Sequence, residues 1–206
     1  MSIGYSIEKA LLQGNPALRL FGMDEAGRGP IAGPLAVGLF RYTPKMRGLL
    51  LNDSKKLSPK SRLKVFQELI ALRSPWAVGF ANACEIDRLG MTKAFRLASK
   101  RAFDTLRDSD FILLVDGILD PRLSVPTLLI PNGDALSGTV AAASIMAKVT
   151  RDALMEKLSQ KYPVYGFDGH KGYPTLDHIL RVKRFGPCPE HRRSFAPLKG
   201  HERQAS

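Results

Sequence analysis

Short apolar runs bounded by Gly, Pro, Asn and Asp recur along the chain, and such runs are typical of β-strands. Five of them predict strands, at residues 18–23, 35–42, 76–81, 111–115 and 127–130. Helical segments lie between several of these runs, while a short link joins the first two and resembles a hairpin more than a crossover. The pattern therefore predicts an α/β protein with a five-stranded mixed sheet flanked by helices.

Apolar residues at helical spacing predict the helices. The clearest start is Ser58 followed by Pro59, an N-cap residue before a proline at the first helical position. Behind this signal, apolar residues recur at Leu63, Phe66 and Ile70. Further helices are expected at about 92–107, 138–160 and 175–185.

The helix expected at 138–160 carries a single apolar stripe. Its members recur at intervals of three, four and seven residues: Val140, Ala143, Ala147, Leu154 and Leu158. A stripe of this kind must be covered by another apolar surface. We expect the sheet to cover it.

Length and charge describe a single basic domain. The chain has 206 residues without an internal repeat or linker, so we expect one domain, with a core at about 18–160 and a basic helical extension at about 161–206. The net charge is +12, which favours a polyanionic partner such as nucleic acid. From Gly169 onward, eight Lys or Arg stand against three Asp or Glu, a plausible clamp on a phosphate backbone. A solvated basic face remains the alternative.

Cysteine usage and hydropathy indicate the compartment. Cys84 and Cys188 are far apart, which indicates neither a zinc site nor a disulfide framework. No cationic segment followed by a long apolar stretch opens the chain, and no apolar run approaches the roughly 18 residues of a membrane span. We therefore expect a soluble cytoplasmic protein with no membrane contact.

Four acidic residues of this basic chain lie close to predicted element ends. Asp24 and Glu25 follow the first apolar run, Asp116 follows 111–115, and Asp134 precedes the alanine-rich helix. Taken singly, each is explained as a turn or helix-capping residue. Neighbouring central strands, however, would bring Asp24 and Asp116 side by side at one edge of the sheet, where α/β proteins hold ligands.

Carboxylates gathered at one place require a cation. Two of them about 4 Å apart repel by roughly 4 kcal/mol at an effective dielectric near 20. Because no His/Cys cluster is available, an all-oxygen site selects Mg²⁺ or Mn²⁺. A carboxylate-bound metal beside a basic surface indicates phosphoryl transfer on nucleic acid, in which two ions can activate water and steady the leaving oxygen.

Two other functions compete with this hypothesis. Gly27, Gly29 and Gly33 imitate the glycine loop of a dinucleotide-dependent oxidoreductase. The two preceding carboxylates would repel a pyrophosphate, however, and Pro30 removes an amide donor. A non-catalytic basic nucleic-acid-binding module predicts binding that weakens with salt but does not depend on divalent ions.

Several motifs in order identify a family. The chain closely resembles bacterial ribonuclease HII, the type 2 ribonuclease H, over about 20–195. The segments that carry the resemblance are MDEAGRGPIAGPLAVG (23–38), NDSKKLS (52–58), ILLVDG (112–117), AAASIMAKVTRD (141–152), YGFDGHKGYPTLDH (165–178) and FGPCPEHRRSF (185–195).

The resemblance implies a ribonuclease H-like fold and a metal site. The catalytic and metal-binding carboxylates carry over to Asp24, Glu25, Asp116 and Asp134. They would hold Mn²⁺ or Mg²⁺, with two ions when substrate is bound. Asp152 is the rival for the fourth place, but it follows Lys148 by four residues and is explained by a helix-face ion pair.

The resemblance also implies the substrate and its contacts. The family hydrolyses the RNA strand of RNA/DNA hybrids and cuts 5′ of single ribonucleotides in duplex DNA, leaving 3′-hydroxyl and 5′-phosphate ends, and it suggests a monomer. Gly27, Arg28 and Gly29 match the segment that recognises the ribonucleotide 2′-hydroxyl, which separates RNA from DNA. Tyr173 matches the tyrosine that stacks on the following deoxyribose.

Two further positions concern phosphate and electrostatic contacts. Asn52 and Lys55 match positions expected to contact substrate phosphate, although a solvated lysine pair is the alternative for Lys55. Asn132 stands where the family usually has lysine, so one contact near Asp134 differs from the family pattern.

Overall fold

A five-stranded mixed sheet forms the centre of the molecule. We describe it from a computed structural model, for residues 3–49, 51, 57–106 and 110–199. The strands lie in the order β3-β2-β1-β4-β5. Their bounds are β1 Leu20–Ala26, β2 Leu35–Arg41, β3 Trp76–Ala81, β4 Ile112–Asp116 and β5 Thr127–Ile130. The predicted fold class is therefore confirmed.

Strand pairing follows the predicted mixture. β1 pairs with β2 and β2 with β3 in antiparallel register, while β1 pairs with β4 and β4 with β5 in parallel register. β1 is thus the strand at which the sheet changes from one kind of pairing to the other.

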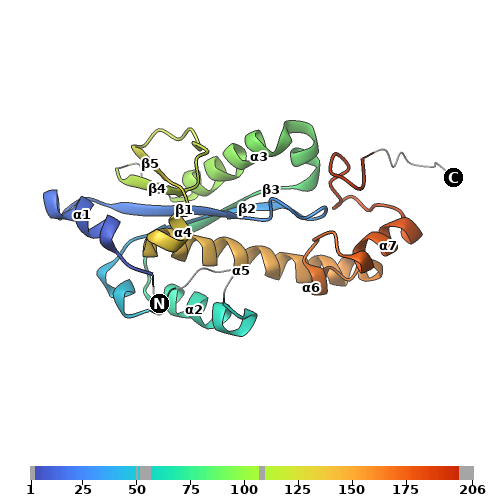
Figure 1. Ribbon diagram of the computed structural model, residues 1–206, viewed down its shortest axis with the longest axis horizontal. Coiled ribbons are helices and arrows are strands. Elements are labelled where there is room, and N and C mark those ends of the chain that lie inside the picture. Colours follow the sequence, from blue (N-terminus) through green and yellow to red (C-terminus); the bar gives the residue numbers. More distant parts are fainter. Residues whose placement is uncertain (1–2, 50, 52–56, 107–109, 200–206) are drawn as a thin grey trace.

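Helices cover both faces of the sheet (Figure 1). α3 lies on one face, and α5 and α2 lie on the other. α6 and α7 lie at the far end of α5. The helical bounds are α1 Ser6–Gly14, η1 Pro44–Gly48, α2 Pro59–Ala71, α3 Ala83–Leu106, α4 Gly133–Leu136, α5 Gly138–Lys161, η2 Pro163–Tyr165, α6 Phe167–His170 and α7 Leu176–Phe185. Among the described helices, none has the length and apolar character needed to cross a membrane.

Three features differ from the sequence-based expectations. α1 was not expected, and α3 begins at Ala83 rather than near residue 92. Asn82 and Glu85 exchange backbone-to-side-chain hydrogen bonds of 2.8 and 2.9 Å and cap this start, while Gly90, at φ 73°, kinks the helix and interrupts its pattern. In α2, Leu63 is 48% exposed, because Val65 and Leu69 face the core instead.

The alanine-rich helix α5 packs directly on the sheet, as its stripe predicts. Gly22 in β1 permits the close approach, since a Cβ atom there would stand 2.2 Å from the carbonyl oxygen of Thr139. Val140, Ala143 and Ala147 are fully buried. A side chain larger than hydrogen at residue 22 would push α5 away from the sheet.

The C-terminal extension packs on the body of the protein. Its apolar residues join Ile31, Ala32 and Met155 in one buried cluster. The members from the extension are Tyr165, Phe167, Val182, Cys188 and Leu198. Through this cluster the extension lies against the loop between β1 and β2 and against the last turns of α5.

Candidate active site

The parallel pairing of β1 and β4 brings two predicted acids to one edge of the sheet. Met23 is opposite Val115, so Asp24 and Asp116 are the next residues of neighbouring strands. Asp24 and Glu25 lie among the last residues of β1, as expected, but the strand does not end at Met23 as its apolar run predicts. β1 continues to Ala26, because Asp24 and Glu25 pair with Gly38 and Val37 of β2.

Asp24 lies in an electrostatically unfavourable environment for a carboxylate. Its side chain is buried, and burial is the first reason why its pKa stands well above the usual range. The negative charges of Glu25 and Asp116 raise this pKa further, while a hydrogen bond with Ser144 and one from the Glu25 amide lower it. The site therefore disfavours the ionised carboxylate unless a cation is present.

Asp116 is joined to the segment that carries Asp134. The backbone amides of Gly133 and Asp134 donate to Asp116 Oδ1 at 2.6 and 3.4 Å. Asn132 precedes them in the left-handed conformation, at φ 57°. The helix-capping alternative for Asp134 was wrong, because the N-cap of α5 is Ser137, which accepts from the amide of Val140. Asp134 is itself buried within the short helix α4.

We refer to Asp24, Glu25, Asp116 and Asp134 as the acidic edge. Within the described ranges, no three Asp, Glu, His or Cys side chains already form a group that could hold a metal ion. Glu25 instead pairs with Arg28, whose guanidinium lies 5.3 Å from the ring centroid of Phe95. The chemistry of the edge nevertheless fits Mg²⁺ or Mn²⁺, since oxygen ligands suit these ions and a cation would relieve the repulsion at Asp24.

Two buried arginines hold the loop between β1 and β2. Arg192 donates to the carbonyls of Gly27, Arg28 and Gly33 at 2.7, 3.1 and 2.9 Å. Arg151 donates to further carbonyls of this loop and the C-terminal segment, namely Pro34 at 2.9 Å, Ala32 at 3.3 Å and Lys171 at 3.1 Å. We call Arg151 and Arg192 the arginine brace.

The arginine brace fixes the main chain of the predicted sugar-reading segment. Gly27 has a φ of +100°, and a Cβ atom there would stand 2.3 Å from Arg151 Nε, so this position requires glycine. Sequence reasoning missed both arginines. The available signal was their place in two of the family segments, Arg151 before Asp152 and Arg192 between His191 and Arg193. The sequence does not show, however, that their side chains are buried.

Tyr173 lies next to this segment. Its side chain is 42% exposed, and its Cε1 atom is 3.6 Å from where a Cβ atom of Gly29 would be. Lys148 Nζ lies 6.0 Å from its ring centroid. The structure therefore brings the predicted stacking residue together with the predicted sugar-reading segment.

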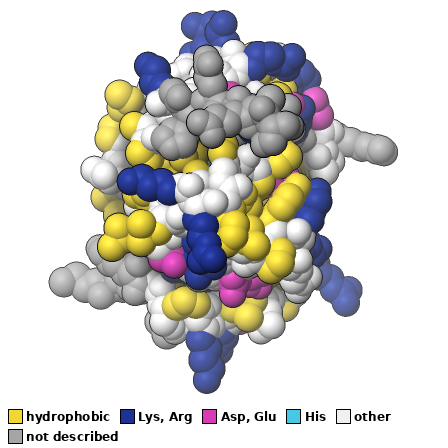
Figure 2. Space-filling model, turned by 90° about the vertical axis from the view of Figure 1, so that its right-hand side faces the viewer, with side chains coloured by type: hydrophobic (Ala, Val, Ile, Leu, Met, Phe, Trp, Pro, Cys, Tyr) yellow, Lys and Arg dark blue, Asp and Glu magenta, His cyan; other side chains and the backbone are white. Residues whose placement is uncertain are grey.

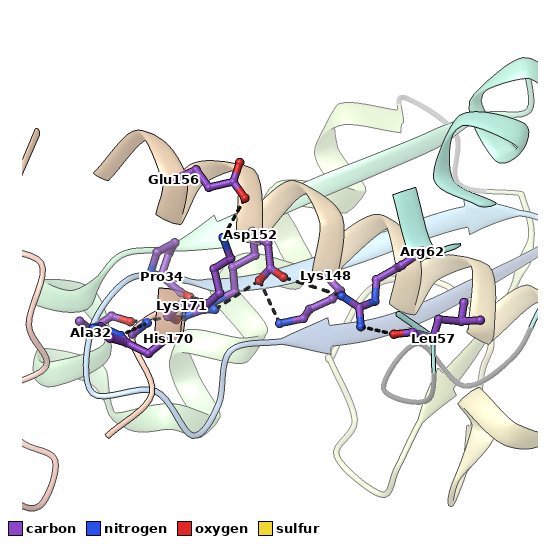
Figure 3. A network of polar contacts seen from close by, with 11 residues as sticks. Ala32, Pro34, Leu57, Arg62, Lys148, Asp152, Glu156, His170 and Lys171 are labelled. Atoms are coloured by element: carbon purple, nitrogen blue, oxygen red, sulfur yellow. Dashed lines mark hydrogen bonds and ion pairs between the residues drawn. The ribbon is translucent and has the colours of Figure 1, made fainter. Parts of the chain in front are cut away.

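Asp152 lies among cations rather than acids, as Figure 3 shows. Its carboxylate is 2.9 Å from Lys148 Nζ, 3.9 Å from Arg62 and 3.9 Å from Arg151. The ion pair predicted from the spacing of Lys148 and Asp152 is present. Arg62 also donates to the carbonyl of Leu57 at 2.9 Å. Asn52 and Lys55, the predicted phosphate contacts, lie outside the described residues.

Comparison with known sequences gives a consistent family. A family model described as Ribonuclease HII matches residues 21–198. A Ribonuclease HII of Desulfitobacterium hafniense is 46% identical over 185 residues, which are 90% of this chain and 71% of that relative. A Ribonuclease HII of Burkholderia mallei is 41% identical over 196 residues, 95% of this chain and 92% of the relative.

Solved structures agree in fold. The ribonuclease H2 of Pyrococcus horikoshii OT3 superposes with a TM-score of 0.73 at 31% identity, covering 88% of this chain and 95% of that one. Bst-RNase HIII in complex with Mn²⁺ gives a TM-score of 0.69 at 21% identity, covering 89% and 68%, and this similarity concerns the fold alone. By sequence and by fold, the chain belongs to the ribonuclease HII family of ribonuclease H type endonucleases.

Proposed function

We propose that this chain is a metal-dependent endoribonuclease that cuts the RNA strand of RNA/DNA hybrids and the 5′ side of single ribonucleotides in duplex DNA. The products would carry 3′-hydroxyl and 5′-phosphate ends. The parallel pairing of β1 and β4 carries the proposal, because it sets the buried Asp24 beside Asp116. Family membership supports the reaction class.

The acidic edge is the proposed metal site. One or two Mg²⁺ or Mn²⁺ ions, when bound, supply an activated water and stabilise the leaving oxygen of the phosphodiester. Asp24, Glu25, Asp116 and Asp134 would hold them. Glu25 is paired with Arg28 in the structure, so we expect it to exchange this partner for the cation. The released guanidinium of Arg28 would then suit a substrate phosphate.

The segment of Gly27, Arg28 and Gly29 is the proposed reader of the ribose. The arginine brace fixes its carbonyls before substrate arrives, which lowers the entropic cost of recognition. Tyr173 stands beside Gly29 and would stack on the deoxyribose that follows the ribonucleotide. This arrangement would favour a junction between RNA and DNA.

The end of the molecule that carries α6 and α7 suits a nucleic-acid backbone. Figure 2 shows Lys and Arg side chains distributed over this end, with apolar side chains between them. The overall charge of +12 also favours binding of a polyanionic backbone. We expect this end to hold the duplex while the acidic edge performs the chemistry.

The substitution Asp24→Asn tests the metal assignment. We expect cleavage of a DNA duplex carrying one ribonucleotide, measured with Mg²⁺ or Mn²⁺, to fall on the order of 100-fold or more, since a charge acting on the transition state is lost. Asp104→Asn, in an exposed ion pair with Lys100, is the matched control and should cleave at the wild-type rate.

Two outcomes would overturn the proposal. Wild-type cleavage by Asp24→Asn would remove Asp24 from the metal site. Binding of the duplex without cleavage, unchanged by divalent ions or by a chelator, would instead favour the non-catalytic binding module.

A further inference from the structure

Three histidine side chains of the C-terminal extension form a packed group. The rings of His170 and His178 stack at 4.0 Å between centroids, and Nε2 of His178 lies 3.1 Å from Nε2 of His191. His178 and His191 are buried, and the ring of Phe167 packs edge-on against His178. Neither the acidic edge nor the arginine brace uses these side chains.

The hydrogen bonds assign one tautomer to each ring of the central pair. Nδ1 of His178 is 2.9 Å from the carbonyl oxygen of Tyr173, which only accepts, so this nitrogen carries the proton. Nε2 of neutral His178 is then an acceptor, and Nε2 of His191 must donate to it. Nδ1 of His191 is left as an acceptor, and it receives the amide of Cys188 at 3.0 Å.

The pair is linked at both ends to the proposed recognition site. At one end, His178 holds the carbonyl of Tyr173, the proposed stacking residue. At the other end, His191 forms a β-bridge with Ala32 of the braced loop and immediately precedes Arg192. The two rings therefore connect the turn that carries Tyr173 with the loop that carries the sugar-reading segment.

We propose that His178 and His191 are positioning residues for substrate recognition, and that their neutral, tautomer-locked pair sets Tyr173 against the sugar-reading segment. This inference rests on the role proposed for Tyr173. It assigns no contact with substrate to either histidine. Their effect reaches the substrate through the main chain of Tyr173.

The surroundings of the rings favour the neutral forms that the pair requires. Burial lowers the pKa of His178 to about 4, with the proximity of His170 and Arg181 acting in the same direction and the Tyr173 carbonyl and Asp177 acting against it. Burial likewise lowers the pKa of His191 to about 4, helped by His178, His170 and Arg193 and opposed by a hydrogen bond with Cys188. Both rings are therefore neutral at pH 7.

Two near-isosteric variants separate the contacts of His178. The side-chain amide nitrogen of His178→Asn can occupy the place of Nδ1 and keep the bond to Tyr173. The side-chain amide oxygen of His178→Gln can occupy the place of Nε2 and accept from Nε2 of His191, but this variant loses the bond to Tyr173. Each variant removes one ring, so they control for one another. Thermal unfolding of both should be compared before activity is read.

Cleavage is measured as kcat/KM on two duplexes, one with a single ribonucleotide in DNA and one continuous RNA/DNA hybrid. We expect His178→Gln to lower kcat/KM on the single-ribonucleotide duplex about tenfold, because one hydrogen bond is lost. On the RNA/DNA hybrid, kcat/KM should fall less than about twofold. His178→Asn should retain most of the activity on both. In a Tyr173→Ala background, His178→Gln should have no further effect.

Several results would overturn the inference. An equal loss on both duplexes, or the same tenfold loss in the Tyr173→Ala background, would show a merely structural role. If Tyr173→Ala leaves the ratio between duplexes unchanged, Tyr173 does not read the junction and the positioning role falls with it. Failure of the proposed function is distinct, because it would appear as wild-type activity of Asp24→Asn.

A measurement on the wild-type protein keeps the inference testable if a variant does not fold. Long-range ¹H–¹⁵N spectra at pH 7 report which nitrogen of each imidazole carries the proton. We expect a protonated Nδ1 in His178 and a protonated Nε2 in His191. The opposite tautomer of either ring, or a doubly protonated ring, would contradict the proposed pair.

Discussion

The acidic edge and the arginine brace both adjoin the loop after β1, and both bury charged groups. At the acidic edge, the nearest charges around Asp24 are of the same sign and raise its pKa. At the arginine brace, the buried guanidinium of Arg192 donates to three backbone carbonyls. Asp24 is therefore buried beside charges of its own sign, whereas Arg192 is buried among hydrogen-bond acceptors.

The difference separates a structural role from a functional one. A buried cation surrounded by carbonyls is satisfied by the protein itself and stabilises the loop that provides them. A buried carboxylate such as Asp24, whose charged neighbours repel it, is stabilised further by a cation brought from outside. We therefore expect substitutions in the brace to act on folding, and substitutions at the edge to act on metal binding and cleavage.

Among the substitutions, the largest loss of stability is expected from Arg192→Met. This change leaves the carbonyls of Gly27, Arg28 and Gly33 buried without their donor, and we expect it to lower the free energy of unfolding by about 3 kcal/mol. Urea denaturation measures the loss. Arg193→Met is the matched control, since its guanidinium makes a hydrogen bond of only 3.5 Å to Pro187. Equal midpoints for both variants would show that the brace does not hold the loop.

An effect of pH on stability is also expected, and it has opposite signs in the two regions. The pKa values of His178 and His191, next to the brace, fall from 6.5 to about 4 on folding. Their contribution to stability is therefore complete above pH 6.5 and is lost as the pH falls toward 4. Urea midpoints between pH 4 and 7 should show this slope, and a variant lacking both rings should show less of it. An unchanged slope in that variant would assign it to other groups.

Asp24 should give the reverse slope in metal-free protein. Its pKa in the folded state lies above the ordinary 3.8, so its contribution is complete below that pH and is lost as the pH rises through the raised pKa. Asp24→Asn should remove this loss and unfold at higher urea than the wild type at neutral pH. Lower stability of Asp24→Asn in metal-free buffer would contradict the comparison, because it would show that the protein already compensates this charge.

The smallest effect is expected where charges are exposed. Lys100 and Asp104 form an ion pair of 2.8 Å on α3, with side chains 66% and 53% exposed. Because water screens such pairs, Asp104→Asn should change the free energy of unfolding by less than about 0.5 kcal/mol. The same urea series measures it. A loss as large as that of Arg192→Met would remove the distinction between buried and exposed charge on which the comparison rests.

Local signals were sufficient for most of the sheet and helices. The strands at 76–81 and 127–130 were predicted to the residue, since each is an apolar run between breakers. The start of α2 at Pro59 followed from its cap and proline. The true end of β1 was not predictable in the same way, because Asp24 and Glu25 interrupt its apolar pattern while their backbone still pairs with β2.

For the candidate site, the sequence predicts the acidic residues but not the buried groups that surround them. Asp24 and Asp116 could be placed together because both follow runs that become neighbouring strands. Arg192 could not be distinguished from Arg193, since only tertiary packing buries one and leaves the other half-buried. The tautomers of His178 and His191 likewise depend on partners 5 and 13 residues away, which no sequence pattern specifies.

The arrangement of β1 also limits which insertions and deletions the protein can tolerate. One strand carries a glycine under α5, then Asp24 and Glu25, and then passes directly into the braced loop. Successive residues of a strand point to opposite faces, so inserting or deleting a single codon here would exchange the two faces of everything that follows in the strand. A point substitution in β1 therefore changes one side chain and its contacts. A change in the length of β1 would instead alter the position of the acids relative to the loop.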